Sequence, residues 1–295
     1  MKILVLGSTG YLGGNIVHRL IGAGHEVFCV VRKTSDLSRI DSLPVKYIIN
    51  NYEQIELTLK TEKIDWIING VCTYNKNHTW YEDMFESNLV FPLNILNLAM
   101  KYSVPNFMTM GTGLPNDFNV YSYTKGQLSE IGKFFSTRSE INFFDLKLEM
   151  FYGGMFEPES RFIRNTIKKL YEGQSLELTS GKQKRDIVRV EDICDIIIAI
   201  IEEYRDEHSG YHRIPIGTGE HHSIKEIVEY LKEVTCSSSE LKFGALKDRE
   251  NGEPDTLADM SWLKEKGRKM NYSYFEGLKE VAQRYDPNRS EYQQT

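Results

Sequence analysis

The sequence predicts an α/β fold with a doubly wound parallel sheet and a second, smaller α/β domain. Two observations lead to this expectation. Short apolar runs alternate with amphipathic stretches through the first half of the chain, and a glycine-rich turn separates the first run from the first amphipathic stretch. Short strands that alternate with helices are typical of βαβ units, whose right-handed crossovers cover both faces of a parallel sheet.

The individual elements follow from the apolar periodicity. Apolar residues at helical spacing predict helices at Gly10–Ile21 and Phe85–Met100 in the first half. The expected strands of that half are Lys2–Leu6, Glu26–Val31, Val45–Ile49, Trp66–Ile68 and Asn106–Met110. After about Leu148 the alternation loosens. The elements expected there are a strand at Tyr211–Ile216 and helices at Ile193–Ile201, Ile224–Val234 and Tyr274–Tyr285.

Composition and charge argue against several classes of protein. The chain of 295 residues carries a formal net charge of −6, whereas nucleic-acid-binding domains usually carry a basic surface. No apolar run reaches the roughly 18 residues that a membrane span needs, and the opening run is too short for a signal peptide. We therefore expect a cytoplasmic protein that binds neither nucleic acid nor membrane.

The cysteines and histidines do not form a metal-binding pattern. The four cysteines are scattered without a CxxC pair, and His221-His222 has no third ligand at a suitable spacing. Because Cys29, Cys72 and Cys194 lie in apolar segments, we expect buried reduced thiols at these three positions.

The glycine-rich turn is the first candidate binding site. Gly7-Ser8-Thr9-Gly10-Tyr11-Leu12-Gly13 joins the first expected strand to the first expected helix. In a Rossmann-like dinucleotide site, the first glycine permits the turn, the second lets the backbone approach a pyrophosphate, and the third lets helix and strand pack closely. The N–H groups at the helix start then bind the phosphates.

The end of the second expected strand predicts which dinucleotide binds. An NAD site places a carboxylate there to accept the ribose hydroxyls, but this segment reads Arg32-Lys33-Thr34. Arg32 and Lys33 can instead neutralise a 2′-phosphate. The sequence therefore favours NADP(H) over NAD(H). Asn51, after the third strand, is a further candidate contact with the cofactor.

A tyrosine and a lysine form the second candidate site. Tyr121 and Lys125 are spaced i, i+4, so that both lie on one face of a helix. A phenol can protonate the alkoxide that forms when hydride reaches a carbonyl, and a nearby ammonium is expected to lower the phenol's pKa. Lys125 can also bind the nicotinamide ribose. Thr112 follows the fifth expected strand, where it can hydrogen-bond a substrate carbonyl, while its rival Thr109 lies within the strand.

In this order and spacing, these motifs resemble the extended short-chain dehydrogenase/reductases that modify nucleotide sugars. Asn88 matches a recurrent asparagine of that family, and Phe151-Tyr152-Gly153 matches its turn near the nicotinamide, with Gly154 in place of proline. The resemblance implies a cofactor contact from Tyr152. It also implies that Arg185 and Arg249 contact the nucleotide diphosphate. It further implies dimerisation through the helix of Tyr121, so a homodimer is expected.

The resemblance also implies a domain plan. Residues 1–150 and 187–217 would form the dinucleotide-binding domain. Residues 151–186 and 218–286 would form the nucleotide-sugar-binding domain, and 287–295 a polar tail.

The residues after Thr112 narrow the reaction. Dehydratases of the family carry an Asp-Glu pair where this chain has Gly113 and Leu114, and the GDP-fucose synthase kind carries a cysteine that is missing here. Two reactions remain, NADPH-dependent 4-ketoreduction and NAD-retaining 4-epimerisation, beside a non-catalytic NADP(H)-binding module. The segments around Thr112 and Tyr121 look most similar to 4-ketoreductases of the CDP-abequose and CDP-paratose synthase type. These enzymes act on CDP-linked 3,6-dideoxyhexuloses.

Overall fold

The computed structural model describes residues 1–74, 81–204, 210–249, 252 and 254–288. The chain divides into two compact units. Unit 1 comprises Met1–Leu148 and Ile193–Ile214, and unit 2 comprises Glu149–Asp192 and Pro215–Thr295. Residues 149–150, 187–192 and 215–217 lie in unit 2, whereas the sequence analysis expected them in the dinucleotide-binding domain. Most of the expected polar tail lies outside the described residues.

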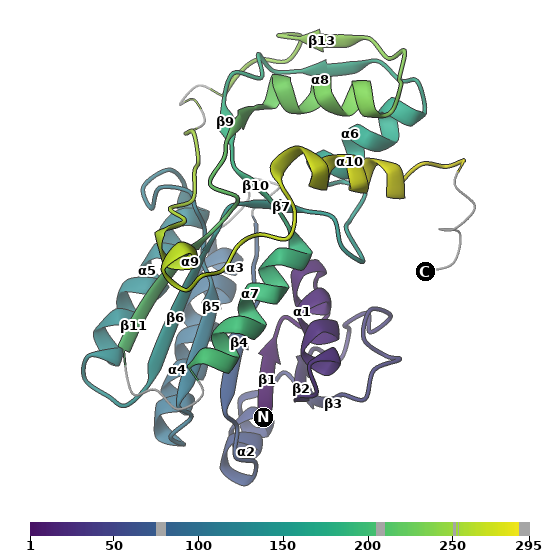
Figure 1. Cartoon of the computed structure of the whole chain (residues 1–295). Helices are drawn as coiled ribbons and strands as arrows, with labels where there is room; N and C mark the ends of the chain where they lie inside the picture. The colour runs from purple at the N-terminus through teal and green to yellow at the C-terminus, as the bar shows by residue number, and fades with distance from the viewer. Residues whose placement is uncertain (75–80, 205–209, 250–251, 253, 289–295) are drawn as a thin grey trace. The chain divides into compact units, whose positions relative to one another are not determined.

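Unit 1 is built on a seven-stranded sheet with the order β11-β6-β5-β4-β1-β2-β3 (Figure 1). All pairings from β6 through to β3 are parallel. The expected Rossmann-like fold is confirmed. The strands are β1 (Lys2–Leu6), β2 (Glu26–Val31), β3 (Lys46–Ile49), β4 (Trp66–Asn69), β5 (Asn106–Met110), β6 (Asn142–Leu148) and β11 (Gly210–Ile216).

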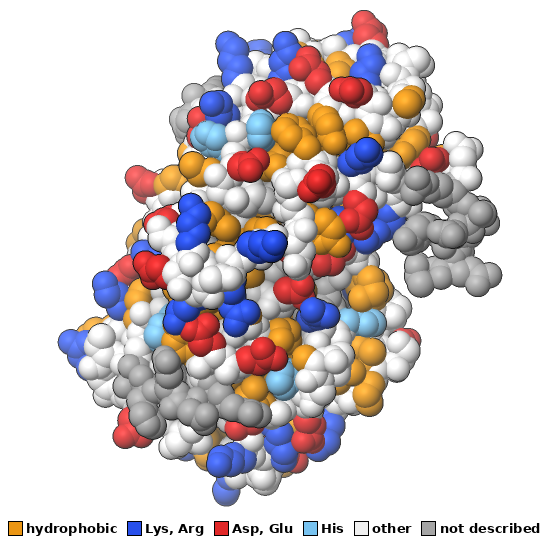
Figure 2. All heavy atoms as spheres, viewed as in Figure 1, with side chains coloured by type: hydrophobic (Ala, Val, Ile, Leu, Met, Phe, Trp, Pro, Cys, Tyr) orange, Lys and Arg blue, Asp and Glu red, His pale blue; other side chains and the backbone are white. Residues whose placement is uncertain are grey.

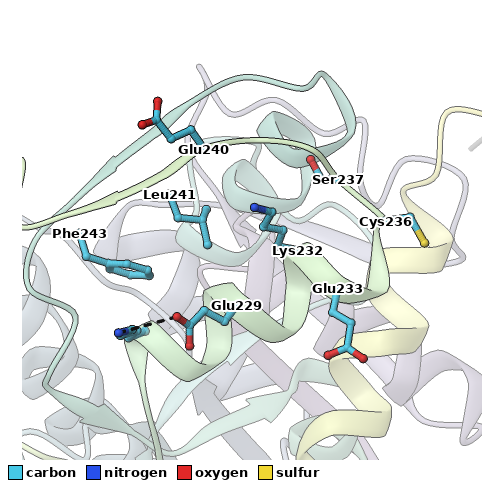
Figure 3. Close-up of a pocket in the computed structure, with 9 residues that line it drawn as sticks. Glu229, Lys232, Glu233, Cys236, Ser237, Glu240, Leu241 and Phe243 are labelled. Carbon is cyan, nitrogen blue, oxygen red and sulfur yellow. Dashed lines mark ion pairs between the residues drawn. The ribbon is translucent and has the colours of Figure 1, made fainter.

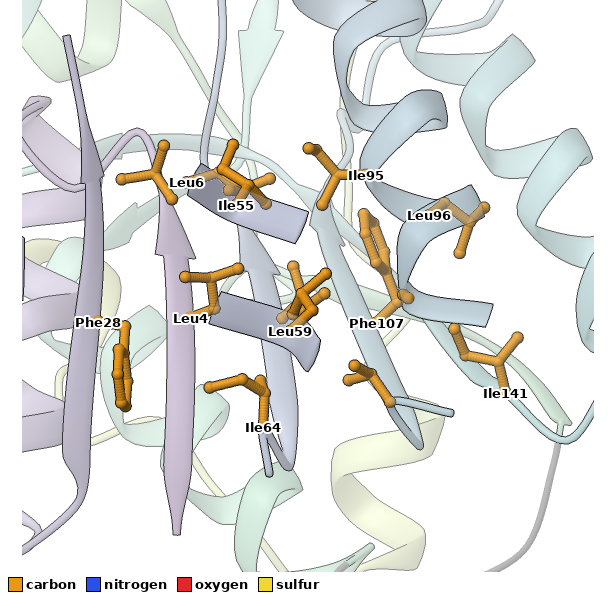
Figure 4. Packing of buried hydrophobic residues seen from close by; sticks show 14 of the residues in the cluster. Leu4, Leu6, Phe28, Ile55, Leu59, Ile64, Ile95, Leu96, Phe107 and Ile141 are labelled. Carbon is orange, nitrogen blue, oxygen red and sulfur yellow. The ribbon is translucent and has the colours of Figure 1, made fainter. Parts of the chain in front are cut away.

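Helices cover both faces of this sheet (Figure 1). α2 (Tyr52–Thr61), α4 (Phe91–Lys101) and α5 (Val120–Ser136) pack on one face, where they share a buried apolar cluster with the strands (Figure 4). α1 (Tyr11–Gly22) and α7 (Val190–Glu203) are joined by an Arg19–Asp195 ion pair. Every residue of β1 after Lys2 is fully buried, as expected for a central strand that is covered on both sides.

The helix expected at Phe85–Met100 is not uniform. α3 (Glu82–Phe85) leads into a π-helical stretch, η1 (Glu86–Val90), which continues into α4. A π-helical turn shifts the phase of the side chains that follow it, and such turns are frequent at functional sites. Asn88 lies within this turn, and its side chain is completely buried.

Unit 2 consists of short paired strands and helices around its own apolar core. α8 (Ile224–Val234) begins with a capping box between Ser223 and Glu226, and matches the expected helix residue for residue. The other helices are α6 (Phe162–Tyr171), α9 (Ser261–Glu265) and α10 (Tyr274–Arg284). The strand pairs are β7 (Met150–Tyr152) with β10 (Ile187–Arg189), β8 (Leu176–Leu178) with β13 (Leu241–Phe243), and β9 (Lys184–Arg185) with β12 (His222–Ser223).

Acidic and basic side chains are interspersed over the face of the molecule in Figure 2. Among the described residues, no helix is both long enough and apolar enough to span a bilayer.

Candidate active site

The glycine turn lies at the carboxyl end of β1, beside the end of β4. β1 pairs with β2 on one side and with β4 on the other, so the strand order reverses its direction at β1. Ligands of doubly wound sheets bind at such a switch point. Gly7 has a φ of +76°, and a Cβ on it would lie 2.8 Å from the carbonyl carbon of Gly70. Only glycine fits this close approach of the two strand ends.

Gly13 controls how closely α1 packs against the turn. A Cβ at this position would lie 2.0 Å from the carbonyl oxygen of Gly7, which is far inside van der Waals contact. Gly10 is the N-cap of α1, and no side chain caps the helix there. The helix N-terminus is therefore free of the side-chain oxygen that would compete with a phosphate. This cradle, which a Cβ would fill, fits the pyrophosphate of a dinucleotide.

Arg32 and Lys33 follow β2 as expected, and both are exposed. The structure adds Arg39, which the sequence analysis missed. The Nη1 of Arg39 donates to the Thr9 carbonyl oxygen at 2.7 Å. The Nε2 of His18 lies 2.8 Å from the backbone carbonyl oxygen of Arg39, within hydrogen-bond distance. These contacts hold a third basic side chain against the glycine turn, although it is remote from that turn in sequence.

Asn51 has a local structural role. It is the N-cap of α2, and its Oδ1 accepts a hydrogen bond of 2.7 Å from the Gln54 backbone N–H. No described contact joins Asn51 to the glycine turn.

The two threonines near the end of β5 differ in what they bind. Thr109 is buried within the strand, and its hydroxyl accepts a hydrogen bond from Asn69 at 3.0 Å. Thr112 lies beyond the strand, where its Oγ1 accepts from the Leu114 backbone N–H at 3.3 Å. In that bond the Thr112 oxygen acts as acceptor, so its hydrogen can still be donated to a ligand.

Tyr121 and Lys125 lie in the first two turns of α5, which begins with a capping box at Asn119. Lys125 is buried, and its Nζ donates to the Val71 carbonyl oxygen at 3.0 Å. The expectation that Lys125 lowers the pKa of Tyr121 is not met. The pKa of Tyr121 is well above its ordinary value because of burial first, and then because of Tyr74 and Cys72 beside it.

The segment after β4 therefore contributes neighbours of Tyr121 that the sequence analysis did not identify. The Tyr74 hydroxyl donates to the Tyr121 hydroxyl at 3.3 Å, and the two ring centroids are 4.5 Å apart. Cys72, which was expected to be a buried thiol, is exposed, because it follows β4 instead of lying in it. Their position just past the carboxyl end of a strand was the available signal, since ligand-binding side chains gather at this edge.

Asn88 holds this segment in place. Its Oδ1 accepts from the Thr73 backbone N–H at 2.8 Å, and its Nδ2 donates to the Thr73 carbonyl oxygen at 3.0 Å. Nδ2 also approaches the Thr124 hydroxyl at 3.4 Å, which connects the segment to α5. Asn88 and Lys125 thus fix the backbone on both sides of Cys72.

We predict that Asn88→Ala destabilises the protein by about 1–3 kcal/mol, because buried polar groups lose their partners. Asn94→Ala on the following helix is the matched control. Asn94 donates one exposed hydrogen bond to Tyr52, so the Asn94→Ala variant should lose no more than about 0.5 kcal/mol of stability. Denaturant unfolding of both variants measures the difference, and equal stability losses would contradict this role of Asn88.

Three expected site residues lie in unit 2. Tyr152 is 2% exposed and its ring belongs to the apolar core, so the expected contact of this residue with the cofactor stays a prediction. The ring has room there because residue 277 is a glycine. A Cβ at this position would lie 2.5 Å from the Tyr152 phenol oxygen. Arg185 is buried and donates to the Lys184 and Pro254 carbonyl oxygens, whereas Arg249 is exposed.

A surface hollow of about 620 Å³ lies elsewhere, over α8 and β13 of unit 2 (Figure 3). Phe243 and Leu241 form its apolar part, and a Lys225–Glu229 ion pair lies at its side. None of the expected site residues lines it, so it is not a candidate active site.

Comparisons with known proteins identify the family of this chain. Residues 3–217 match the model of the NAD dependent epimerase/dehydratase family. A CDP-abequose synthase from Salmonella typhimurium is 28% identical over 96% of this chain and 97% of that protein. A probable GDP-L-fucose synthase 1 from Oryza sativa subsp. japonica is 24% identical over 97% of this chain and 92% of that protein.

Solved structures share the fold. The UDP-glucose 4-epimerase from Thermotoga maritima, crystallised with UDP-glucose, aligns with a TM-score of 0.83 at 19% identity, over 96% of this chain and 98% of that one. The Thermus thermophilus UDP-glucose 4-epimerase in complex with NAD aligns with a TM-score of 0.81 at 17% identity, over 98% and 100% of the two chains.

Proposed function

Because this chain belongs to the NAD dependent epimerase/dehydratase family, we propose that it is a nucleotide-sugar 4-ketoreductase. Its substrate is a nucleotide-linked 6-deoxy- or 3,6-dideoxy-4-hexulose, with CDP as the nucleotide, and NADPH is the reductant. The similarity to CDP-abequose synthases over nearly the whole chain supports both the substrate class and the nucleotide.

The observation that carries this proposal is the environment of Tyr121. Reduction of a ketone needs an acid that still holds its proton when the alkoxide forms. Burial keeps the pKa of Tyr121 well above its ordinary value, so the side chain is a neutral phenol at physiological pH. A protonated phenol suits the proton-donating step of a ketone reduction. The choice of a reductase over an epimerase is supported by the similarity to CDP-abequose synthases.

Each candidate residue has a specific task. Tyr121 donates its proton to the O4 atom of the sugar. Thr112 donates a hydrogen bond to the same oxygen and stabilises its developing charge. Lys125 holds the Val71 carbonyl and places a positive charge in the turn after Tyr121.

The residues of unit 1 fit NADP(H), which supplies the hydride when bound. The glycine cradle holds the pyrophosphate, and the absence of an acid among residues 32–34 leaves Arg32 and Lys33 to neutralise the 2′-phosphate. Arg39 lies close enough to the glycine turn to add to this charge. In unit 2, Arg185 and Arg249 are candidates for contacts with the nucleotide diphosphate of the substrate.

We expect Arg32→Ala to weaken NADPH binding by about tenfold or more, because charge-assisted hydrogen bonds contribute about 1.5–3 kcal/mol. NADH binding should change by less than about twofold, since NADH carries no 2′-phosphate. Lys63→Ala, which removes an exposed charge from the same unit, is the control. Fluorescence titration measures both affinities. An equal loss for NADPH and NADH would argue against this contact.

The function itself is tested with purified protein, NADPH and a panel of 4-keto-6-deoxy sugars carrying CDP, GDP, UDP or dTDP. We expect NADPH oxidation, fastest with the CDP sugars. Binding of NADPH without oxidation across the panel would indicate a non-catalytic module, and NAD retained through purification would indicate a 4-epimerase.

A further inference from the structure

We propose that Tyr74 is a proton-relay residue that returns a proton to Tyr121 after each catalytic cycle. The inference depends on the proposed function for its chemistry, but it rests on a separate observation. Two phenol groups from different elements, one after β4 and one on α5, are in contact through both their rings and their hydroxyl groups.

The geometry favours proton transfer between the two side chains. Their hydroxyl oxygens are 3.3 Å apart, close to the range in which a proton moves between heavy atoms, and such distances commonly shorten when substrate binds. The rings, tilted by 33° at a centroid distance of 4.5 Å, keep the hydroxyls side by side. Tyr74 is therefore held close to the group that it would serve.

The two phenols differ in their access to water. Tyr74 is 51% exposed, whereas Tyr121 is partly buried. A phenolate left on Tyr121 is strongly disfavoured, because burial raises the pKa of this side chain well above its ordinary value. Tyr74 thus provides a path between solvent and a group that must recover its proton quickly.

The position of Tyr74 is fixed by the same residues that surround the active site. Lys125 binds the carbonyl of Val71, and Asn88 binds both backbone groups of Thr73. Because these anchors immediately precede Tyr74, its backbone starts from a defined place at the edge of the sheet.

The proton balance of the relay is complete. Tyr121 gives its hydroxyl proton to the sugar alkoxide and becomes a phenolate. Tyr74 then gives its hydroxyl proton to the Tyr121 oxygen, and a proton from solvent restores the Tyr74 hydroxyl. The net change is one solvent proton delivered to O4 for each hydride transferred, without any further reactant.

Tyr74→Phe tests this role, because it removes the hydroxyl and keeps the ring. We expect kcat to fall by about tenfold, less than the 10²–10⁴-fold typical of a direct proton donor, with KM within about twofold of the original value. Added imidazole buffer should restore part of kcat in Tyr74→Phe but not in Tyr121→Phe. Tyr123→Phe is the control, since Tyr123 is similarly exposed on α5 and is not assigned to the site.

An unchanged kcat would overturn the relay. So would a raised KM with normal kcat, which would identify Tyr74 as a sugar contact, or a loss of kcat that buffer does not restore. A second measurement needs no substrate and separates this proposal from the proposed function. In protein labelled with [13Cζ]tyrosine, Tyr74→Phe should move the Tyr121 resonance, whereas Tyr123→Phe should not. An unmoved resonance would refute the contact even if the enzyme proves to be a ketoreductase.

Discussion

Tyr121→Phe is expected to lower kcat for reduction of the keto sugar by about 10²–10⁴-fold, the usual contribution of a general acid. Phenylalanine keeps the ring that contacts Tyr74, so the fold around the site should be retained. The loss should therefore fall on kcat, while NADPH affinity changes little. Steady-state kinetics under saturating NADPH, together with a separate NADPH titration, measure both quantities.

The control for this substitution is Tyr123→Phe, two residues further along the same helix. Tyr123 is 48% exposed, and we expect its variant to retain full activity. Thermal unfolding of both variants checks that a loss of activity does not come from a loss of folded protein. If Tyr121→Phe turns over at the original rate, the phenol does not donate the proton and the proposed chemistry is wrong.

Gly13→Ala is expected to destabilise unit 1 by at least about 1–3 kcal/mol and to abolish measurable NADPH binding. The added Cβ would lie 2.0 Å from the Gly7 carbonyl oxygen, and its neighbours at that point are backbone atoms that cannot rotate away. α1 must therefore move away from the turn, and the N–H groups that receive the pyrophosphate move with it.

Gly22→Ala is the matched control, because this glycine lies in the same helix and a Cβ there meets nothing within 4 Å. Alanine is the better helix former, so this variant should be as stable as the original or more stable by about 0.5–1 kcal/mol. Denaturant unfolding and NADPH titration compare the two variants. Normal NADPH affinity in Gly13→Ala would show that the glycine cradle does not hold the cofactor.

Apolar periodicity predicted the central strands because they are buried on both faces. The strands β1, β2 and β5 have the same bounds as the strands that the sequence analysis expected. The same reasoning missed β6, whose sequence includes the buried polar residues Asn142 and Asp145. Their partners are distant in the chain: Asn142 donates to Asn106, and Asp145 accepts from Ser129 and Arg213. Local hydrophobicity does not reveal a strand whose buried polar side chains find their hydrogen-bond partners in distant parts of the chain.

The candidate site shows the same limit. The spacing of Tyr121 and Lys125 within one helix could be read directly from the sequence. The position of Tyr74 after the fourth strand could also be read, but its contact with Tyr121 could not. Nor could the contact of Arg39 with the glycine turn, because both contacts join residues that are distant in the chain. Tyr152 illustrates a related limit. A motif match gives a backbone position but not the direction of the side chain, which here points into the core of unit 2.

The most direct test of the account is the fate of the hydride. The purified protein is incubated with a CDP-4-keto-6-deoxyhexose and NADPH deuterated at the transferable position, and the sugar product is analysed by mass spectrometry and NMR. We predict one deuterium at C4 of the product for each NADPH oxidised. NADPH that remains intact while the keto sugar is left unreduced, or a reduced sugar that carries no deuterium at C4, would contradict the assignment as a ketoreductase.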